Sequence, residues 1–206
     1  MKYLALTLVL AACGGSTPQT RYYQLAMPKL HDAHDVGGTV LALEPLGADG
    51  AYDDERIVYR VDPVRLDYYN YHHWSTTPGA MVSSYLQRAL AGTGRFRSVV
   101  RDTTKDTAAV LSGHVIAIEE VDESAFKWSA HVALELTLSD PKTGEVLWSH
   151  AYDEHEPLAM QTPEGLARSL GVAMDRIVAA AAPAVADLAE RTARARGLTA
   201  PTVAGP

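Results

Sequence analysis

Histidine and acidic side chains gather at three places in the sequence, and side chains of these types are common ligands of metal ions. The first place holds His31 and His34, the second is the adjacent pair His72 and His73, and the third runs from residue 150 to residue 156. His31 and His34 lie in a glycine-containing loop, rather than on a helix with an accompanying glutamate. Neighbouring residues of an extended chain point to opposite faces, so His72 and His73 should not bind one ion together. We therefore expect no metal site, and a metal-dependent periplasmic enzyme is the least favoured interpretation.

Other signatures of catalysis are missing from the sequence. It contains no nucleophile-elbow pattern, no phosphate-binding glycine-rich loop with a lysine and no paired-cysteine motif. Gly92-Thr93-Gly94 is too short to indicate a nucleotide site. We expect neither an enzymatic activity nor a cofactor.

Cys13 is the single cysteine of the chain, and it follows a short apolar segment with one lysine before it. This segment runs from Tyr3 to Ala12, and about ten residues are too few to span a bilayer as a helix. Residues 10–13, Leu-Ala-Ala-Cys, resemble the lipobox of bacterial lipoproteins, in which the thiol is lipidated before cleavage. An ordinary signal peptide with a chance cysteine is the alternative, but a lone cysteine cannot form an internal disulfide. We expect a signal peptide over residues 1–12, lipid on Cys13 and a tether over residues 13–20.

The residues after Cys13 bear on the destination of the protein. In the sorting rule that the lipobox resemblance brings with it, an aspartate directly after the cysteine favours retention in the inner membrane. Here Gly14, Gly15 and Ser16 follow instead. We therefore expect delivery to the periplasmic face of the outer membrane.

Aromatic residues are dense between Leu66 and Trp74, where they fall on both faces of a predicted strand. They either complete the core or form a contact surface, because Tyr and Trp bury a large area at low entropic cost and recur at interface hot spots. Our hypothesis is that Tyr69, Tyr71 and Trp74 include residues that contact a partner protein. If the strand is regular, Tyr69 and Tyr71 share one face.

The charge balance limits the classes of partner. The chain has 18 basic and 25 acidic residues, for a net charge of −7. Nucleic-acid binding needs clustered basic residues, so we expect no nucleic-acid partner. A negatively charged domain does not attract anionic lipid either, so the affinity for the membrane should come from the lipid anchor. No further segment reads as a membrane span.

Periodic patterns over residues 21–196 predict one α+β domain, followed by a flexible tail over residues 197–206. Strand patterns occur at residues 22–25, 39–43, 57–61, 66–71, 96–100, 110–118, 126–138 and 146–152. Thr76 or Thr77 with Pro78 should begin one helix, and Thr162 with Pro163 should begin a second. This order of elements predicts a mainly antiparallel sheet with two main helices packed on one face, a two-layer sandwich. The alternating run of residues 126–138 should bury Trp128 and Leu134.

Three motifs, together with the lipobox, carry a resemblance to a known family. They are Tyr22-Tyr23-Gln24-Leu25, the acidic and basic segment of residues 53–60, and Tyr69-Asn70-Tyr71-His72-His73-Trp74 before Pro78. In this order and spacing the chain resembles the ABC-type transport auxiliary lipoproteins, the PqiC-like family. The family's aromatic block more often has arginine before the tryptophan and an acidic residue soon after, whereas this chain has His73 and Ser75.

The resemblance implies a non-enzymatic periplasmic subunit of a lipid-transport system. Such a subunit works with an inner-membrane ABC permease and with mammalian-cell-entry (MCE) domain proteins, and the resemblance permits a homo-oligomer. We therefore expect the domain to dock the periplasmic transporter to the outer membrane. A scaffold or assembly lipoprotein of other envelope machinery is the alternative.

Overall fold

The computed structural model describes residues 18–28 and 38–198 of the 206-residue chain. Cys13, His31 and His34, and most of the predicted tail, lie outside the described residues. The elements in chain order are β1 (Arg21–Tyr23), β2 (Val40–Leu43), β3 (Gly47–Ala48), the short 3-10 helix η1 (Gly50–Tyr52), β4 (Arg56–Asp62), β5 (Arg65–Trp74), α1 (Pro78–Gly92), β6 (Ser98–Val100), β7 (Thr107–Ser124), β8 (Lys127–Ser139), β9 (Val146–Pro157) and α2 (Pro163–Ala195).

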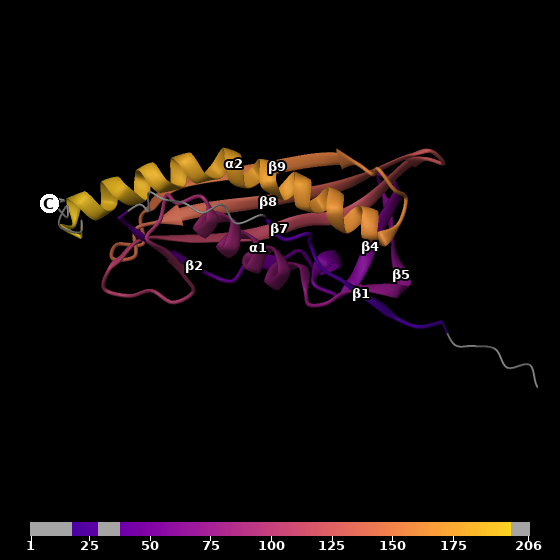
Figure 1. Ribbon diagram of the computed structural model, residues 1–206, viewed down its shortest axis with the longest axis horizontal. Helices are drawn as coiled ribbons and strands as arrows, with labels where there is room; N and C mark the ends of the chain where they lie inside the picture. Colours follow the sequence, from indigo (N-terminus) through magenta and orange to yellow (C-terminus); the bar gives the residue numbers. More distant parts are fainter. Residues whose placement is uncertain (1–17, 29–37, 199–206) are drawn as a thin grey trace, which may run out of the picture.

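One sheet and two helices form two layers, which confirms the predicted α+β class (Figure 1). The long strands β7, β8 and β9 form an antiparallel meander, and β4 and β5 form an antiparallel hairpin. The shorter pairings of β1 with β5, and of β2, β3 and β4 with β7, are parallel. The sheet is therefore mixed. After β5 the chain passes through α1 and re-enters the sheet at β6, which runs parallel to β2.

Strand β8 shows why the helices cover only one face of the sheet. Leu134, Leu136 and Leu138 are fully buried on the face that α2 covers, and the residues between them are less buried. Alternation of this kind places successive side chains on opposite faces. The expected burial is confirmed for Leu134, whereas Trp128 is only partly buried. Phe126, the first residue of the alternating run, is 94% exposed. Both lie at the β7–β8 hairpin tip, which projects beyond the N-terminal start of α2 (Figure 1).

The predicted helix starts are confirmed. Thr77 occupies the N-cap position of α1, directly before Pro78. Thr162 caps α2, and its hydroxyl oxygen accepts a hydrogen bond from the backbone N–H of Gly165 at 3.1 Å. Such a cap satisfies one of the amide groups that the first turn leaves without a helical partner.

Helix α2 continues through Pro183 to Ala195. The expectation that no further segment has the length and composition of a membrane-spanning helix is wrong for this helix. It is long and apolar enough to cross a membrane, but 61% of its most apolar window is buried within the domain. Its polar side chains bind other elements: Asp175 accepts a hydrogen bond from Tyr85 of α1, and Arg176 pairs with β9. It packs as the core helix of the sandwich.

Candidate functional site

Four side chains meet on the sheet face that α1 and α2 leave uncovered. Glu119 of β7 lies opposite His131 of β8, which in turn lies opposite His155 of β9. Residues paired across antiparallel strands project from the same face, so this row brings the three side chains together. Asp153 lies two residues before His155 and therefore projects from the same face.

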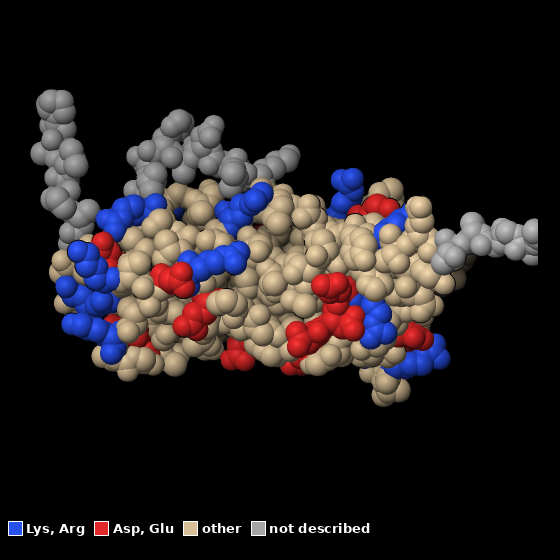
Figure 2. Space-filling view, turned by 90° about the horizontal axis from the view of Figure 1, so that it is seen from below, with Lys and Arg blue, Asp and Glu red and all other residues tan. Residues whose placement is uncertain are grey.

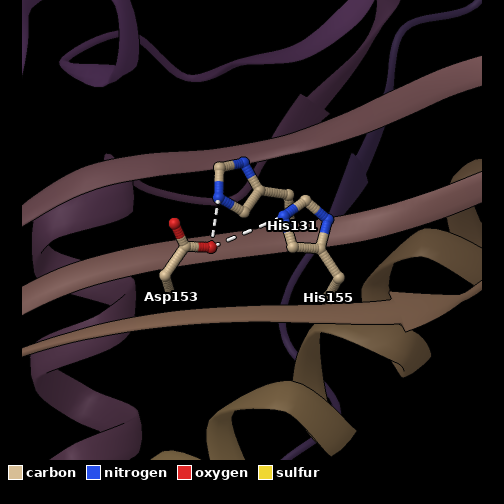
Figure 3. A group of neighbouring side chains, drawn as sticks. All are labelled: His131, Asp153 and His155. Carbon is tan, nitrogen blue, oxygen red and sulfur yellow. Dashed lines mark hydrogen bonds and ion pairs between the residues drawn. The ribbon is translucent and has the colours of Figure 1, made fainter.

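The contacts within this group are short and polar. His131 Nδ1 lies 3.0 Å from Glu119 Oε1, and His131 Nε2 lies 3.1 Å from Asp153 Oδ1. His155 Nε2 approaches the same Asp153 oxygen at 3.4 Å. The two imidazole rings stack with centroids 4.2 Å apart (Figure 3). Both nitrogens of His131 thus face carboxylate oxygens, whereas a neutral imidazole has only one N–H to donate.

Glu119 is the most deeply buried residue of the group, and only 2% of its surface is exposed. Burial raises its pKa, but hydrogen bonds from His131, Arg60 and Tyr52 oppose burial and leave the pKa below its ordinary value. Arg60 Nε donates at 2.9 Å and the Tyr52 hydroxyl donates at 2.8 Å. A carboxylate held by this many donors stays ionised and fixes the orientation of the His131 ring.

The structure divides the predicted histidine cluster of residues 150–156 between two faces. Asp153 and His155 belong to the group on the uncovered face, whereas Glu154 and Glu156 each bind Arg176 of α2 at 2.7 Å. His150 stacks beside Trp148 on its own strand. The sequence analysis did not single out His131, because its partners become visible only from the β8–β9 register.

A second polar group connects β5 to β7 across the intervening strand β4. Tyr69 donates a hydrogen bond from its hydroxyl to Glu120 Oε1 at 2.7 Å, and Glu120 is fully buried. The pKa of Glu120 is raised to about 7, because burial and the nearby charge of Asp122 raise it by more than the Tyr69 hydrogen bond lowers it. Burial also raises the pKa of Asp122. Glu120 Oε2 and Asp122 Oδ1 have no hydrogen-bond partner among the described residues.

The aromatic segment of β5 does not lie as a regular strand would. Between the pairs Arg56–His73 and Val58–Tyr68 the register shifts, so that several residues of β5 face a single residue of β4. This bulge breaks the alternation on which the expected common face of Tyr69 and Tyr71 rested.

The three residues of the partner hypothesis consequently have different environments. Trp74 is fully buried in the core, so it has no surface to offer a partner, which corrects the expectation for this residue. Tyr69 is half-buried and bonded to Glu120. Tyr71 is 44% exposed and is the one of the three that is open to contact.

The sequence analysis missed a further exposed aromatic residue on the neighbouring strand. Tyr22 of β1 is 64% exposed, and its ring lies 5.9 Å from that of His73, two positions after Tyr71. In the described sheet β1 pairs only with β5, so its other side is an edge. We call Tyr22, Tyr71, His73 and this strand edge the edge aromatic surface. Tyr22 belongs to the Tyr-Tyr-x-Leu motif of the family resemblance. Its place in that motif is the feature of the sequence that could have indicated a contact residue.

Charge is distributed unevenly along the molecule. Figure 2 shows a cluster of Lys and Arg at the end at which α2 finishes in Figure 1, whereas toward the other end Lys and Arg are interspersed with acidic side chains. Strand β1 lies toward the opposite end (Figure 1). The edge aromatic surface is therefore remote from the basic end.

The fold defines a class of α+β domains with solved members. A protein of Xanthomonas campestris from the DUF330 family superposes with a TM-score of 0.68 at 18% identity, covering 87% of this chain and 100% of that one. The structure of an uncharacterized protein gives a TM-score of 0.66 at 14% identity, covering 82% of this chain and 99% of its own. A hypothetical protein of Chlamydia trachomatis gives 0.50 at 8% identity, with coverages of 74% and 98%. Likeness at such low identity establishes the fold alone.

The family is established by sequence. Residues 23–182 match the ABC-type transport auxiliary lipoprotein component family, and the chain belongs to it. The predicted resemblance is thus confirmed. No curated protein matches the chain.

Proposed function

We propose that this protein is the outer-membrane lipoprotein subunit of an ABC/MCE-type lipid-transport system and docks the periplasmic transporter to the outer membrane. Membership of the transport auxiliary lipoprotein family over residues 23–182 is the observation that carries the proposal. The lipobox-like segment before Cys13, without a following aspartate, supports the outer membrane as the site of anchoring. In this role the protein binds partners and catalyses no reaction.

The length of the tether constrains where docking takes place. Cys13 precedes the first residue of β1, Arg21, by eight residues. At roughly 3.3–3.6 Å per extended residue, β1 lies no farther than about 30 Å from a lipid-bearing Cys13. A transporter subunit that contacts the β1 end therefore approaches the membrane that holds the anchor.

The edge aromatic surface has the composition of a docking site. Exposed tyrosines supply contact area at low entropic cost, and a free strand edge accepts an added strand through main-chain hydrogen bonds. We assign the contact with an MCE-domain protein or its permease complex to Tyr22 and Tyr71, with β1 as the strand edge. Tyr69 and Trp74 support this surface from within the domain.

Co-purification of the transporter with surface variants tests the proposal. The double substitution Tyr22→Ala and Tyr71→Ala should keep the melting temperature and membrane anchoring of the original. It should nevertheless lose the MCE-domain protein and the permease, because removing aromatic anchors from an interface costs about 2 kcal/mol or more, roughly a thirtyfold loss of affinity. Phe126→Ala is the matched control, since Phe126 is an exposed aromatic at a hairpin tip. Equal recovery of the transporter by the double variant and the control would refute the assignment of this surface.

A further inference from the structure

The structure assigns a second site to the uncovered face of the sheet: we propose that His131, Asp153 and His155 bind a divalent transition-metal ion, with Zn²⁺ the best match to the ligand types. The potential ligand atoms, one from each residue, all lie within 4.8 Å of one another (Figure 3). Two imidazole nitrogens and one carboxylate oxygen form a donor set typical of zinc.

The separations of the donor atoms suit a tetrahedral ion. With metal–ligand bonds of about 2.0–2.2 Å, two ligand atoms on a tetrahedron lie roughly 3.3–3.5 Å apart. Asp153 Oδ1 lies 3.1 Å from His131 Nε2 and 3.4 Å from His155 Nε2. An ion bound by both imidazoles must lie in the plane of each ring, so one ring has to turn out of the stack, in which the planes are 6° apart. The His155 side chain is 53% exposed and can make this rotation, and Asp153 is exposed enough to follow it.

Glu119 prepares His131 to be a ligand. A metal-binding histidine usually donates its other ring N–H to a carboxylate, which fixes the tautomer and the ring orientation. Glu119 Oε1 lies 3.0 Å from His131 Nδ1, and Glu119 is itself held by Arg60 and Tyr52. When Nδ1–H of neutral His131 donates to Glu119, the lone pair of Nε2 is directed toward Asp153, where it can bind a cation.

A divalent ion suits the position that Asp153 Oδ1 occupies between the two imidazoles. This oxygen lies 3.1 Å from His131 Nε2 and 3.4 Å from His155 Nε2, so all three side chains can reach one ion beside it. The open solvent side leaves a fourth position for water or for a side chain of a bound protein.

The sequence alone predicts no metal site, and the proposed zinc site differs from that expectation. The expectation considered histidines that are close in sequence, whereas the site combines a residue of β8 with two of β9. The second exposed histidine–carboxylate pair in the described part of the chain, His114 with Asp49, has a single histidine and lacks the third ligand.

Zinc titration calorimetry on the full chain without an affinity tag, purified in detergent, tests the site. The unaltered chain should bind Zn²⁺ with a resolved site that also raises its melting temperature, because an ion that binds the folded state stabilises it. His155→Gln should weaken that binding at least about tenfold while leaving the metal-free melting temperature unchanged, since the side chain is exposed. Glu119→Gln, which removes no ligand, should weaken it about 10- to 100-fold.

His150→Gln is the matched control, because this histidine lies on the same strand but stacks with Trp148. It should bind zinc as the unaltered chain does. Zinc affinity unchanged by His155→Gln would overturn the proposal, as would an equal loss in His150→Gln or the absence of binding in the unaltered chain at micromolar zinc. None of these readouts involves the transporter, so failure here leaves the docking function standing.

Discussion

Replacing Glu120 by glutamine should stabilise the protein in alkaline solution and have much less effect in acid. Glu120 is fully buried, and its pKa rises from an ordinary 4.5 to about 7. The folded state therefore holds a proton that the unfolded chain releases. The stability that this proton contributes is fully present below about pH 4.5, and it is lost as the pH rises through about 7.

The expected magnitude follows from the size of the shift. Each unit of pKa corresponds to 1.36 kcal/mol, so the ionised carboxylate costs about 3 kcal/mol at pH values well above 7. Glutamine keeps an oxygen for the Tyr69 hydroxyl and removes the charge beside Asp122. We expect Glu120→Gln to gain about 3 kcal/mol in free energy of unfolding near pH 8 and about 1 kcal/mol or less near pH 5.

Urea denaturation of both proteins at the two pH values measures this difference. A gain of about 3 kcal/mol corresponds to roughly 6–12 °C in melting temperature for a domain of this size, so thermal scans provide a second measurement. Glu123→Gln is the control, because Glu123 lies on the same strand with its side chain 41% exposed. A stability difference between Glu120→Gln and the original that is the same at both pH values would refute the reasoning.

Four further substitutions test the fold and the anchor. Leu134→Ala should cost about 2–5 kcal/mol in unfolding free energy, whereas Lys127→Ala should change it little; equal losses in urea titrations would mean that the β8 alternation is misassigned. Alanine normally favours a helix over glycine by about 1 kcal/mol, but Gly79→Ala should destabilise the protein. The reason is that the new Cβ would lie too close to the backbone carbonyl oxygen of Leu46. An increase in melting temperature would contradict that contact. Cys13→Ser should yield a folded protein that no longer sediments with outer membrane, and undiminished sedimentation in high salt without partners would exclude lipid as the anchor.

Much of the fold could be predicted from local patterns. Met81, Val82, Tyr85 and Leu86 recur at the three- and four-residue spacing that is typical of a helix, and all four are buried in α1. The parallel pairings of β1 with β5 and of β4 with β7 could not be predicted, because they join segments far apart in the chain. The pairing of β4 with β7 also depends on how α1 returns the chain to the sheet. Short strands such as β3, with two residues, carry too few side chains to show a period.

The candidate sites were harder to predict than the fold. The β5 bulge separates Tyr69 from Tyr71, and periodicity alone assumes a regular strand. His131 looked like an ordinary outward-facing residue of β8, and only the register with β7 and β9 brings it to Glu119 and His155. Cross-strand neighbours are set by register, so such a site becomes visible only once the strands are paired.

Capture of the native lipoprotein from detergent-solubilised envelopes tests the docking function most directly. The unaltered protein, recovered from the outer-membrane fraction, should bring down an MCE-domain protein and its ABC permease in a fixed ratio. The variant that combines Tyr22→Ala with Tyr71→Ala should remain in the same fraction without them. Recovery of the unaltered protein with no transporter subunit, or only with components of other envelope machinery, would contradict the proposed function.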